Sequence, residues 1–226
     1  MKTPDELKAL HGAAYVEAFA RVSPARIRRL LPRMRLAPGD RVVDFACGDG
    51  LLMEQVAPRV RSYVGVDFSA PFIAAANRRR VRLGIENAEF VCAEIGDFCA
   101  RHAASFDAAF AMDFSEHVYD PDWLRILGHI HASLRPGGRF YLHTPNAEFF
   151  VERMKQRGFI LRQFPEHVAV RSPRENRALL EQAGFRVVRL QLLAHYNALR
   201  WLHPLSFLPL LGPLFKARIF IEATRD

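Results

Sequence analysis

Cysteine is scarce in this sequence, with 3 among 226 residues. Cys47, Cys92 and Cys99 are too few and too unevenly spaced for a disulfide framework, and none forms a Cys-x-x-Cys pair. This spacing argues against a zinc site and favours a reducing compartment. Long apolar runs are also missing, since none reaches the ~18 residues that a membrane-spanning helix needs. The segment Met1–Glu6 contains no apolar signal core. We therefore expect a cytoplasmic protein, with any membrane contact confined to its surface.

Acidic residues are outnumbered, because Lys and Arg total 32 against 24 Asp and Glu, which gives a formal charge of +8. The positive residues are scattered along predicted helices, and Arg78-Arg79-Arg80 is their one tight cluster. No aromatic platform is interleaved with that cluster, as a nucleic-acid surface would require. We therefore predict no nucleic-acid partner, whereas an anionic small molecule or membrane surface would suit the charge.

The most informative segment is Val42–Leu52, which reads Val-Val-Asp-Phe-Ala-Cys-Gly-Asp-Gly-Leu-Leu. Its apolar start predicts a buried strand, Gly48 and Gly50 predict a tight turn, and the following residues predict a helix. This arrangement holds nucleotide-like ligands at the carboxyl edge of a parallel sheet. The third glycine of a dinucleotide fingerprint is replaced by Met53, which disfavours an NAD-dependent oxidoreductase.

Carboxylates surround this turn. Asp44 lies on the strand and Asp49 in the turn, and both would repel a pyrophosphate but suit a ligand carrying an ammonium and a sulfonium. Asp67 ends the next apolar run, Tyr63–Asp67, where it can accept hydrogen bonds from both hydroxyls of a ribose. S-adenosylmethionine has all of these groups. The alternative is an ordinary loop with glycine turns and a solvated acid.

These motifs resemble those of the class I S-adenosylmethionine-dependent methyltransferases, over about residues 40–145. The resemblance also includes Phe90–Asp97, Phe106–Asp120 and the turn Leu134–Arg139. Ser115-Glu116-His117-Val118, followed by Asp120-Pro121, is similar to the subgroup of ubiquinone-pathway and natural-product O-methyltransferases. The resemblance implies a Rossmann-like, mostly parallel sheet of seven strands in the order 3-2-1-4-5-7-6, with helices on both faces. Periodicity alone predicts only a doubly wound α/β fold.

The resemblance also implies roles for single residues. Asp44, Gly48 and Gly50 would line the methionine half of S-adenosylmethionine, with Ala46 standing where a loop glycine is usual. Asp67 would bind the ribose and Phe68 would pack on the adenine. Glu94, where Asp is commoner, would face the adenine amino group beside Ile95. Separately, the position of Asp113 at the exit of the fourth strand places it beside the expected methyl group, where it could contact the cofactor and orient the acceptor; the alternative is a loop carboxylate that caps Ser115. The product would be S-adenosylhomocysteine.

An acceptor hydroxyl needs its proton removed, and histidine is the usual base. Four histidines are candidates. Each follows or ends a predicted strand or lies in a segment over the acceptor: His117, His143, His167 and His195. His167 is the preferred one. A purely structural role is the alternative for each. Asp113, Glu116 and His117 could together bind a divalent metal, but their spacing is not diagnostic, so we predict no metal site.

The whole chain, 1–226, is predicted to form a single domain, because it has no repeat and no low-complexity linker. It comprises N-terminal helices (1–38), a cofactor-binding core (39–145) and an acceptor-side half (146–226). The predicted helices are Asp5–Val22, Pro24–Met34, 51–59, 70–83, 95–102, 121–134 and 173–183. The predicted strands are 41–46, 62–67, 88–92, 107–112, 138–144, 185–194 and 216–224.

Between the last two strands, 195–215 is a strongly apolar connection interrupted by three prolines, where a tight hairpin would suffice. Four interpretations stay open: a lid over the acceptor pocket, contact with a membrane or lipid-like substrate, packing against a second subunit in a homodimer, and a satellite core. For the whole protein we predict a methyltransferase acting on a small-molecule acceptor, most simply at oxygen by in-line transfer. The alternatives are an RNA or protein methyltransferase and a non-catalytic cofactor-binding module.

Overall fold

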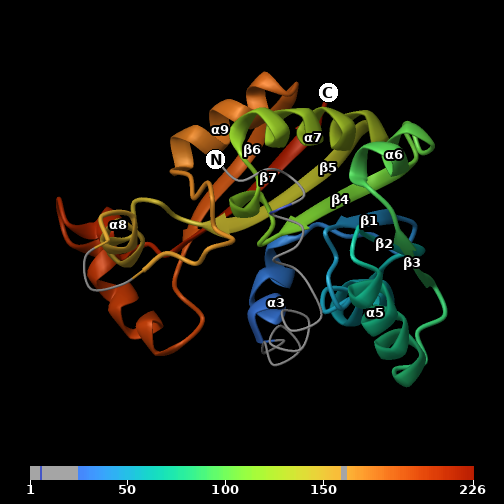
Figure 1. The fold of residues 1–226 in the computed structure, drawn as a ribbon, viewed down its shortest axis with the longest axis horizontal. Coiled ribbons are helices and arrows are strands. Elements are labelled where there is room, and N and C mark those ends of the chain that lie inside the picture. Colours follow the sequence, from blue (N-terminus) through green and yellow to red (C-terminus); the bar gives the residue numbers. More distant parts are fainter. Residues whose placement is uncertain (1–5, 7–24, 159–161) are drawn as a thin grey trace.

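The computed structural model describes residues 6, 25–158 and 162–226 and places seven strands in one sheet (Figure 1). The strand order is β3-β2-β1-β4-β5-β7-β6, and β7 runs antiparallel to both β5 and β6. Both features confirm what the family resemblance implied. The strands are β1 (Arg41–Phe45), β2 (Ser62–Asp67), β3 (Ala88–Cys92), β4 (Phe106–Met112), β5 (Leu134–Pro145), β6 (Phe185–Leu193) and β7 (Arg218–Arg225).

Helices cover both faces of the sheet. In Figure 1, α6, α7 and α9 lie over one face and α3 and α5 over the other, while α8 lies with the C-terminal 3₁₀ segments at one end of the molecule. The α-helices are α3 (Ala25–Leu30), α4 (Met53–Val56), α5 (Ala70–Arg82), α6 (Ile95–Ala100), α7 (Asp120–Ser133), α8 (Phe150–Gln156) and α9 (Pro173–Gln182). The 3₁₀ helices are η1 (Leu31–Arg33), η2 (Ala57–Arg59), η3 (Ser115–His117), η4 (Ala198–Phe207) and η5 (Gly212–Phe215).

The core consists of two apolar layers, one on each face of the sheet. Trp123, Leu127 and Ile130 of α7 are fully buried in the first layer, and Ile27 and Leu30 of α3 are buried in the second. The central strands are therefore buried on both sides, which explains why β1 and β4 read as continuous apolar runs rather than alternating ones.

Two predicted helices are shorter than expected because of proline. The segment predicted as helix 51–59 is α4 followed by the 3₁₀ turn η2, which contains Pro58. The segment Pro24–Met34 likewise becomes α3 followed by η1, which contains Pro32. Proline has no N–H to donate and clashes with the preceding turn, so the α-helix cannot continue through it.

The other predicted helices and strands within the described residues begin and end at, or within a few residues of, the observed boundaries. The strand predicted at 138–144 begins earlier, at Leu134, which pairs with Phe106 across an irregularity in β4. Helix α8 was not predicted, since it is short and has no side-chain cap. Helix α9 begins as predicted at the capping box of Ser172 and Glu175. The predicted helix Asp5–Val22 lies outside the described residues, apart from Glu6.

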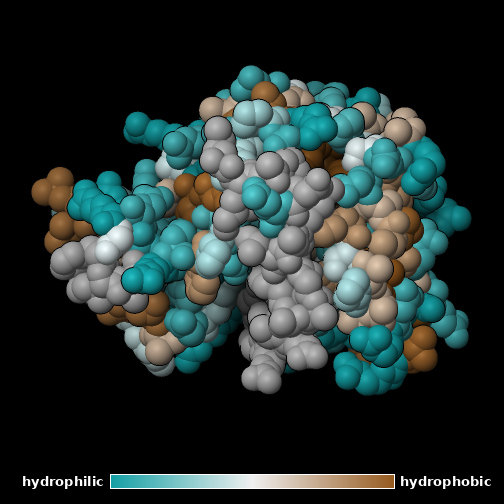
Figure 2. Space-filling view, viewed as in Figure 1, coloured by the Kyte–Doolittle hydropathy of each residue, from teal (hydrophilic) through white to brown (hydrophobic). Residues whose placement is uncertain are grey.

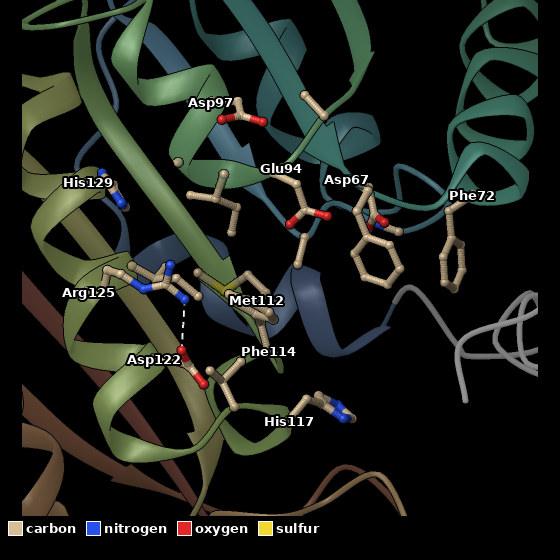
Figure 3. A pocket seen from close by; sticks show the side chains of 18 of the residues that line it. Asp67, Phe72, Glu94, Asp97, Met112, Phe114, His117, Asp122, Arg125 and His129 are labelled. Carbon is tan, nitrogen blue, oxygen red and sulfur yellow. Dashed lines mark hydrogen bonds and ion pairs between the residues drawn. The ribbon is translucent and has the colours of Figure 1, made fainter. Parts of the chain in front are cut away.

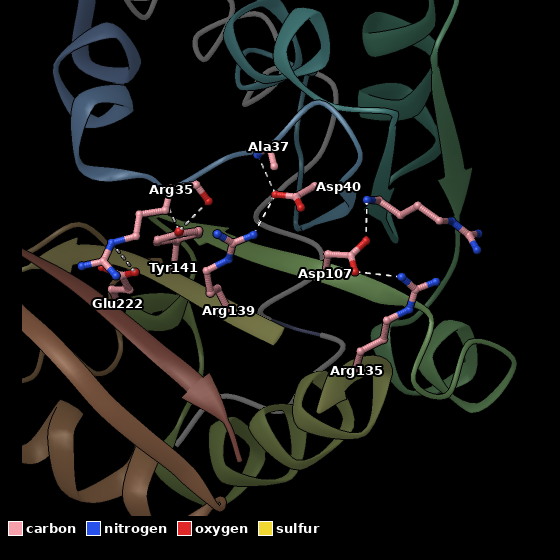
Figure 4. A network of polar contacts seen from close by, with 9 residues as sticks. Arg35, Ala37, Asp40, Asp107, Arg135, Arg139, Tyr141 and Glu222 are labelled. Carbon is pink, nitrogen blue, oxygen red and sulfur yellow. Dashed lines mark hydrogen bonds and ion pairs between the residues drawn. The ribbon is translucent and has the colours of Figure 1, made fainter. Parts of the chain in front are cut away.

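Ion pairs stabilise the amino-terminal edge of the sheet, opposite the strand ends where ligands are expected (Figure 4). The Asp40 carboxylate accepts hydrogen bonds from the Ala37 N–H at 2.9 Å and the Arg139 guanidinium at 2.8 Å. Tyr141 accepts a hydrogen bond from the Arg35 N–H at 2.8 Å. These contacts fix the segment before β1 to the sheet and leave the opposite edge for the site.

Gly65 in β2 offers a test of how tightly the sheet is packed. A Cβ atom at this position would lie 2.4 Å from the Phe90 ring of the neighbouring strand β3. Gly65→Ala should therefore lower the free energy of unfolding by about 1–3 kcal/mol, as overpacking does, measured by urea denaturation. Gly39→Ala is the control, because nothing lies within 4 Å of its Cβ position. Adding Phe90→Leu to Gly65→Ala should restore part of the stability, because Cys47 Sγ would still lie 2.9 Å from the new Cβ. A single variant as stable as the parent would contradict the argument.

Candidate active site

A cavity of about 690 Å³ opens where β1, β2 and β4 end at their carboxyl edge (Figure 3). The residues that line it include Ala46 after β1, Asp67 at the end of β2, Glu94 after β3 and Met112 at the end of β4. The side chains of α7 complete it on the far side, with Arg125 and His129 labelled in Figure 3. This is the position at which a parallel α/β sheet binds its ligand.

The loop after β1 has the positive φ angles that its two glycines predicted. Gly48 and Gly50 adopt positive φ values of 54° and 76°. Ala46 also has a positive φ, 54°, so the residue that replaces the family's loop glycine keeps a glycine-like conformation. The small Ala46 and Gly48 line the cavity, where a larger side chain would occupy ligand space.

Asp67 is buried and joins the ends of two strands. One of its carboxylate oxygens accepts a hydrogen bond from the Gly48 N–H at 3.0 Å, and the other accepts from the Ser69 N–H at 2.9 Å. The same side chain lines the cavity. A carboxylate oxygen can accept more than one hydrogen bond, so the group that holds the two loops can also accept from ligand hydroxyls.

The other predicted cofactor residues divide into two groups. Phe68, Glu94, Ile95 and Asp113 all line the cavity. Asp44 does not, because its carboxylate accepts a hydrogen bond from the Tyr63 hydroxyl at 2.5 Å and faces a smaller cavity of about 20 Å³ that shares Ala46 and Met112.

Gly50 lies against the ring of Phe90, 2.8 Å from where its Cβ would be, and so serves packing below the loop. Sequence reasoning missed Arg125 and His129. In the sequence, the one feature that could have indicated them is their position on the helix that follows β4.

Asp113 is the centre of a polar network behind the cavity wall. Its backbone has a positive φ of 56°, and its N–H donates to the His143 carbonyl at 2.8 Å. Its carboxylate lies 2.8 Å from Nδ1 of the buried His143 and 3.3 Å from the Arg218 guanidinium. Because a carboxylate only accepts, Nδ1 carries the hydrogen, and Nε2 then accepts from the Tyr196 hydroxyl, which it contacts. His143 therefore orients Asp113 and does not line the cavity.

Glu116 is a buried acid next to this network. The Thr144 hydroxyl donates to its carboxylate at 3.2 Å. Burial, and then the nearby Asp113 carboxylate, raise the pKa of Glu116 to about 8. The side chain is therefore mostly protonated at neutral pH. A perturbed acid beside a ligand cavity is typical of functional sites.

His117 lines the cavity, and His167 lies directly behind it. Their rings meet edge to face with centroids 5.0 Å apart, and His117 Nδ1 is 3.1 Å from the Glu166 carbonyl. Burial lowers the pKa of His167. In the described part of the chain, Glu116, His117 and His167 each offer a ligand atom within 4.8 Å of the others. That no metal binds here stays a prediction.

Arg171 holds the loop that presents His117, and sequence reasoning did not find it. Its buried guanidinium donates to the carbonyls of Ser115 at 2.7 Å and Val118 at 2.6 Å, and to the Asp120 carboxylate at 2.8 Å. The arginine therefore adds a charged donor to the Ser115 carbonyl, which also accepts from the Val118 N–H at 3.3 Å, and ties both ends of the η3 loop together.

A methyltransferase domain family matches residues 15–190 of this chain. The chain belongs to this methyltransferase family. It is similar to the ubiquinone biosynthesis O-methyltransferase of Aromatoleum aromaticum, with 29% identity over 90% of this chain and 84% of that protein. The enzyme of the same name from Xanthomonas axonopodis pv. citri is 31% identical over 55% of this chain and 51% of its own length.

The fold is also similar to that of known structures. Geranyl diphosphate C-methyltransferase from Streptomyces coelicolor A3(2), solved with Mg²⁺, geranyl diphosphate and S-adenosylhomocysteine, superimposes with a TM-score of 0.68. It covers 93% of this chain and 82% of that one, at 18% identity, which shows the fold alone. S-adenosylmethionine is the methyl donor of the family, and the residues fit it, since a glycine loop and buried Asp67 line a cavity of adequate size.

The pKa of Glu116 predicts a particular pH dependence of stability. The pKa of Glu116 is about 8 in the folded chain, against an ordinary value of 4.5. Its protonation therefore contributes fully to the stability of the folded chain below pH 4.5, and this contribution is lost as the pH rises through 8. Glu116→Gln should remove this loss, so that the variant gains stability over the parent at alkaline pH.

The measurement is the thermal midpoint between pH 5 and 9, with the exposed Glu181→Gln as the control. Parallel curves for the parent and Glu116→Gln would show that Glu116 does not titrate in this range.

Proposed function

We propose that this methyltransferase transfers the methyl group to a hydroxyl of a small, apolar acceptor. The observation that carries the proposal is the cavity that runs from the ribose-type acid Asp67 to His117 at the exit of β4. The similar relatives named ubiquinone biosynthesis O-methyltransferases support both oxygen as the acceptor atom and an apolar, lipid-like acceptor. We infer a small molecule rather than RNA or protein, since the residues of this site, including some from α6 and α7, line a concave cavity of the size that small ligands occupy.

In this proposal the donor supplies an activated methyl on its sulfonium sulfur. Asp67 accepts hydrogen bonds from the ribose hydroxyls, while Glu94 accepts from the adenine amino group and Ile95 packs against the ring. Asp44 contributes charge from beneath the loop rather than by direct contact, because it faces the smaller cavity. Asp113 is held rigidly by His143 and Arg218 and orients the acceptor. Alignment of this kind supplies much of the rate of group transfer.

We propose His117 as the general base and His167 as a residue that positions it. His117 lines the cavity, whereas His167, the candidate preferred from sequence, lies behind it. The Glu166 carbonyl can only accept, so His117 Nδ1 carries the hydrogen and Nε2 keeps the lone pair that removes a proton. Glu116 is mostly protonated at neutral pH and would not compete for that proton.

In the described part of the chain, no helix is long and apolar enough to cross a membrane. We propose a cytoplasmic enzyme that meets its lipid-like acceptor at a membrane surface. A homodimer stays a prediction.

The acceptor class can be tested with labelled S-adenosylmethionine and matched pairs of acceptors. Phenols and anilines carrying the same alkyl tail are compared with tailless phenols and with total RNA. Label in the tailed phenols would support the proposal. Label confined to the anilines would move the acceptor atom to nitrogen, and label in RNA would replace a small molecule with a nucleic acid.

Asp67→Asn should weaken binding of S-adenosylhomocysteine by at least about 100-fold, because charge-assisted hydrogen bonds to two hydroxyls contribute ~1.5–3 kcal/mol each. Isothermal calorimetry gives the dissociation constant. Asp97→Asn is the control, since Asp97 lines the same cavity from α6. Because Asp67 also joins two loops, the thermal midpoint is measured alongside, and unchanged affinity in a folded variant would refute the ribose role.

His117→Ala should lower kcat by about 100-fold or more, the usual contribution of a positioned base. Affinity for S-adenosylhomocysteine should stay unchanged, because the residue faces the acceptor end. His167→Ala is the comparison and should cost less, since His167 does not line the cavity. Equal kcat in His117→Ala and the parent enzyme would remove His117 from the mechanism.

A further inference from the structure

Large apolar side chains gather on the outer surface of η4, η5 and the turn between them. Leu210 is 97% exposed, Phe207 83% and Trp201 72%, and Leu208 and Leu211 are also exposed. This segment is the red one beside α8 in Figure 1, and brown atoms mark that end of the molecule in Figure 2. Exposed apolar side chains elsewhere in the described chain are few and scattered. A contiguous exposed patch of this kind marks an interaction surface.

The backbone holds these side chains outward. Leu210 has a positive φ of 65°, which costs a leucine about 1–2 kcal/mol. The turn is closed tightly at Gly212, whose N–H donates to the Leu208 carbonyl at 3.0 Å. A Cβ at Gly212 would lie 2.2 Å from the Ser206 carbonyl oxygen. The segment is also anchored from within, since the Phe215 ring packs on Phe150 of α8 at 5.7 Å.

Two of the four interpretations of this segment do not fit the structure. The lining residues of the large cavity all fall between Ala46 and His129, so 198–215 does not cover it as a lid. The exposed fractions contradict a satellite core, because the largest apolar side chains face solvent. A membrane and a second subunit remain.

The charge around the patch favours a membrane. From His195 to Ala217 the sequence contains no Asp or Glu, while Arg200 and Lys216 flank the apolar residues. The Arg200 guanidinium lies over the Trp201 ring, 5.1 Å from its centroid. Helix α8 beside it adds the exposed Arg153 and Arg157. Cations around an apolar surface complement anionic headgroups, whereas two copies of the patch would bring like charges together.

We propose that 198–215 is a docking surface for an anionic lipid bilayer. Trp201, Phe207 and Leu210 enter the boundary between headgroups and acyl chains, and Arg200 and Lys216 contact the headgroup phosphates. The biological role of this docking rests on the proposed function, because docking would bring the cavity close to an acceptor dissolved in the membrane. The binding itself requires neither donor nor acceptor.

The test is co-sedimentation of the full chain with phosphatidylcholine vesicles, with and without phosphatidylglycerol. We expect binding to the anionic vesicles, weakened by salt, with a blue shift of Trp201 emission. Trp123, the other of the 2 tryptophans, is buried and should not respond. Phe207→Ser with Leu210→Ser should lower vesicle binding at least ~tenfold, which is about 1.4 kcal/mol.

The matched control is Val81→Ser with Leu83→Ser, which removes two exposed apolar side chains near the end of α5 and should leave binding unchanged. Equal loss in the control, or no vesicle binding by the parent protein, would overturn the proposal. So would a dimer, seen by analytical ultracentrifugation, that the Phe207 and Leu210 changes dissolve while vesicle binding stays absent.

Affinity for S-adenosylhomocysteine and methyl transfer to the tailed phenols in detergent are measured in the parent protein and in the same variants. If the parent protein lacks both, the proposed function is contradicted and the docking surface is not.

Discussion

The buried carboxylate of Asp67 is the contact on which the geometry of the site depends. It accepts the N–H groups of Gly48 and Ser69, so the loops after β1 and β2 hold a common position. Gly48 and Gly50 can adopt positive φ angles there because they have no Cβ, and their N–H groups donate to Asp67 and to the Cys47 carbonyl. The same carboxylate faces the cavity, where ligand hydroxyls can reach it. One acid therefore both joins two loops of the fold and lines the cavity.

We propose that the acceptor binds at the other end of the cavity, where buried charges are balanced. The Asp113 carboxylate contributes to the raised pKa of Glu116, and it is itself paired with Arg218 and in contact with His143. Because Glu116 is mostly protonated at neutral pH, it would not compete with His117, the base that we propose.

The cavity at the carboxyl edge could be predicted from sequence because the residues that line it there follow strands that are close in the chain. A strand, two glycines and an acid at the next strand end indicate its place, and Gly48, Asp67 and Glu94 all line it. The acceptor half could not be predicted, because Arg171, Tyr196 and Arg218 reach it from the distant C-terminal half. No local pattern distinguishes a buried, paired arginine from the many solvated ones. Proline likewise ended helices whose apolar period continued.

The connection between β6 and β7 links the exposed apolar segment to the polar network around Asp113. Tyr196, just before η4, contacts His143, and Arg218, the first residue of β7, pairs with Asp113. The segment that carries the exposed Phe207 and Leu210 is thus anchored at both ends in the network behind the acceptor side of the cavity. A hairpin of minimal length would satisfy the antiparallel pairing of β6 and β7 equally well. The added residues are therefore not needed for strand pairing. Because both ends of the segment contact the network around Asp113, the exposed apolar surface is attached directly to one wall of the cavity.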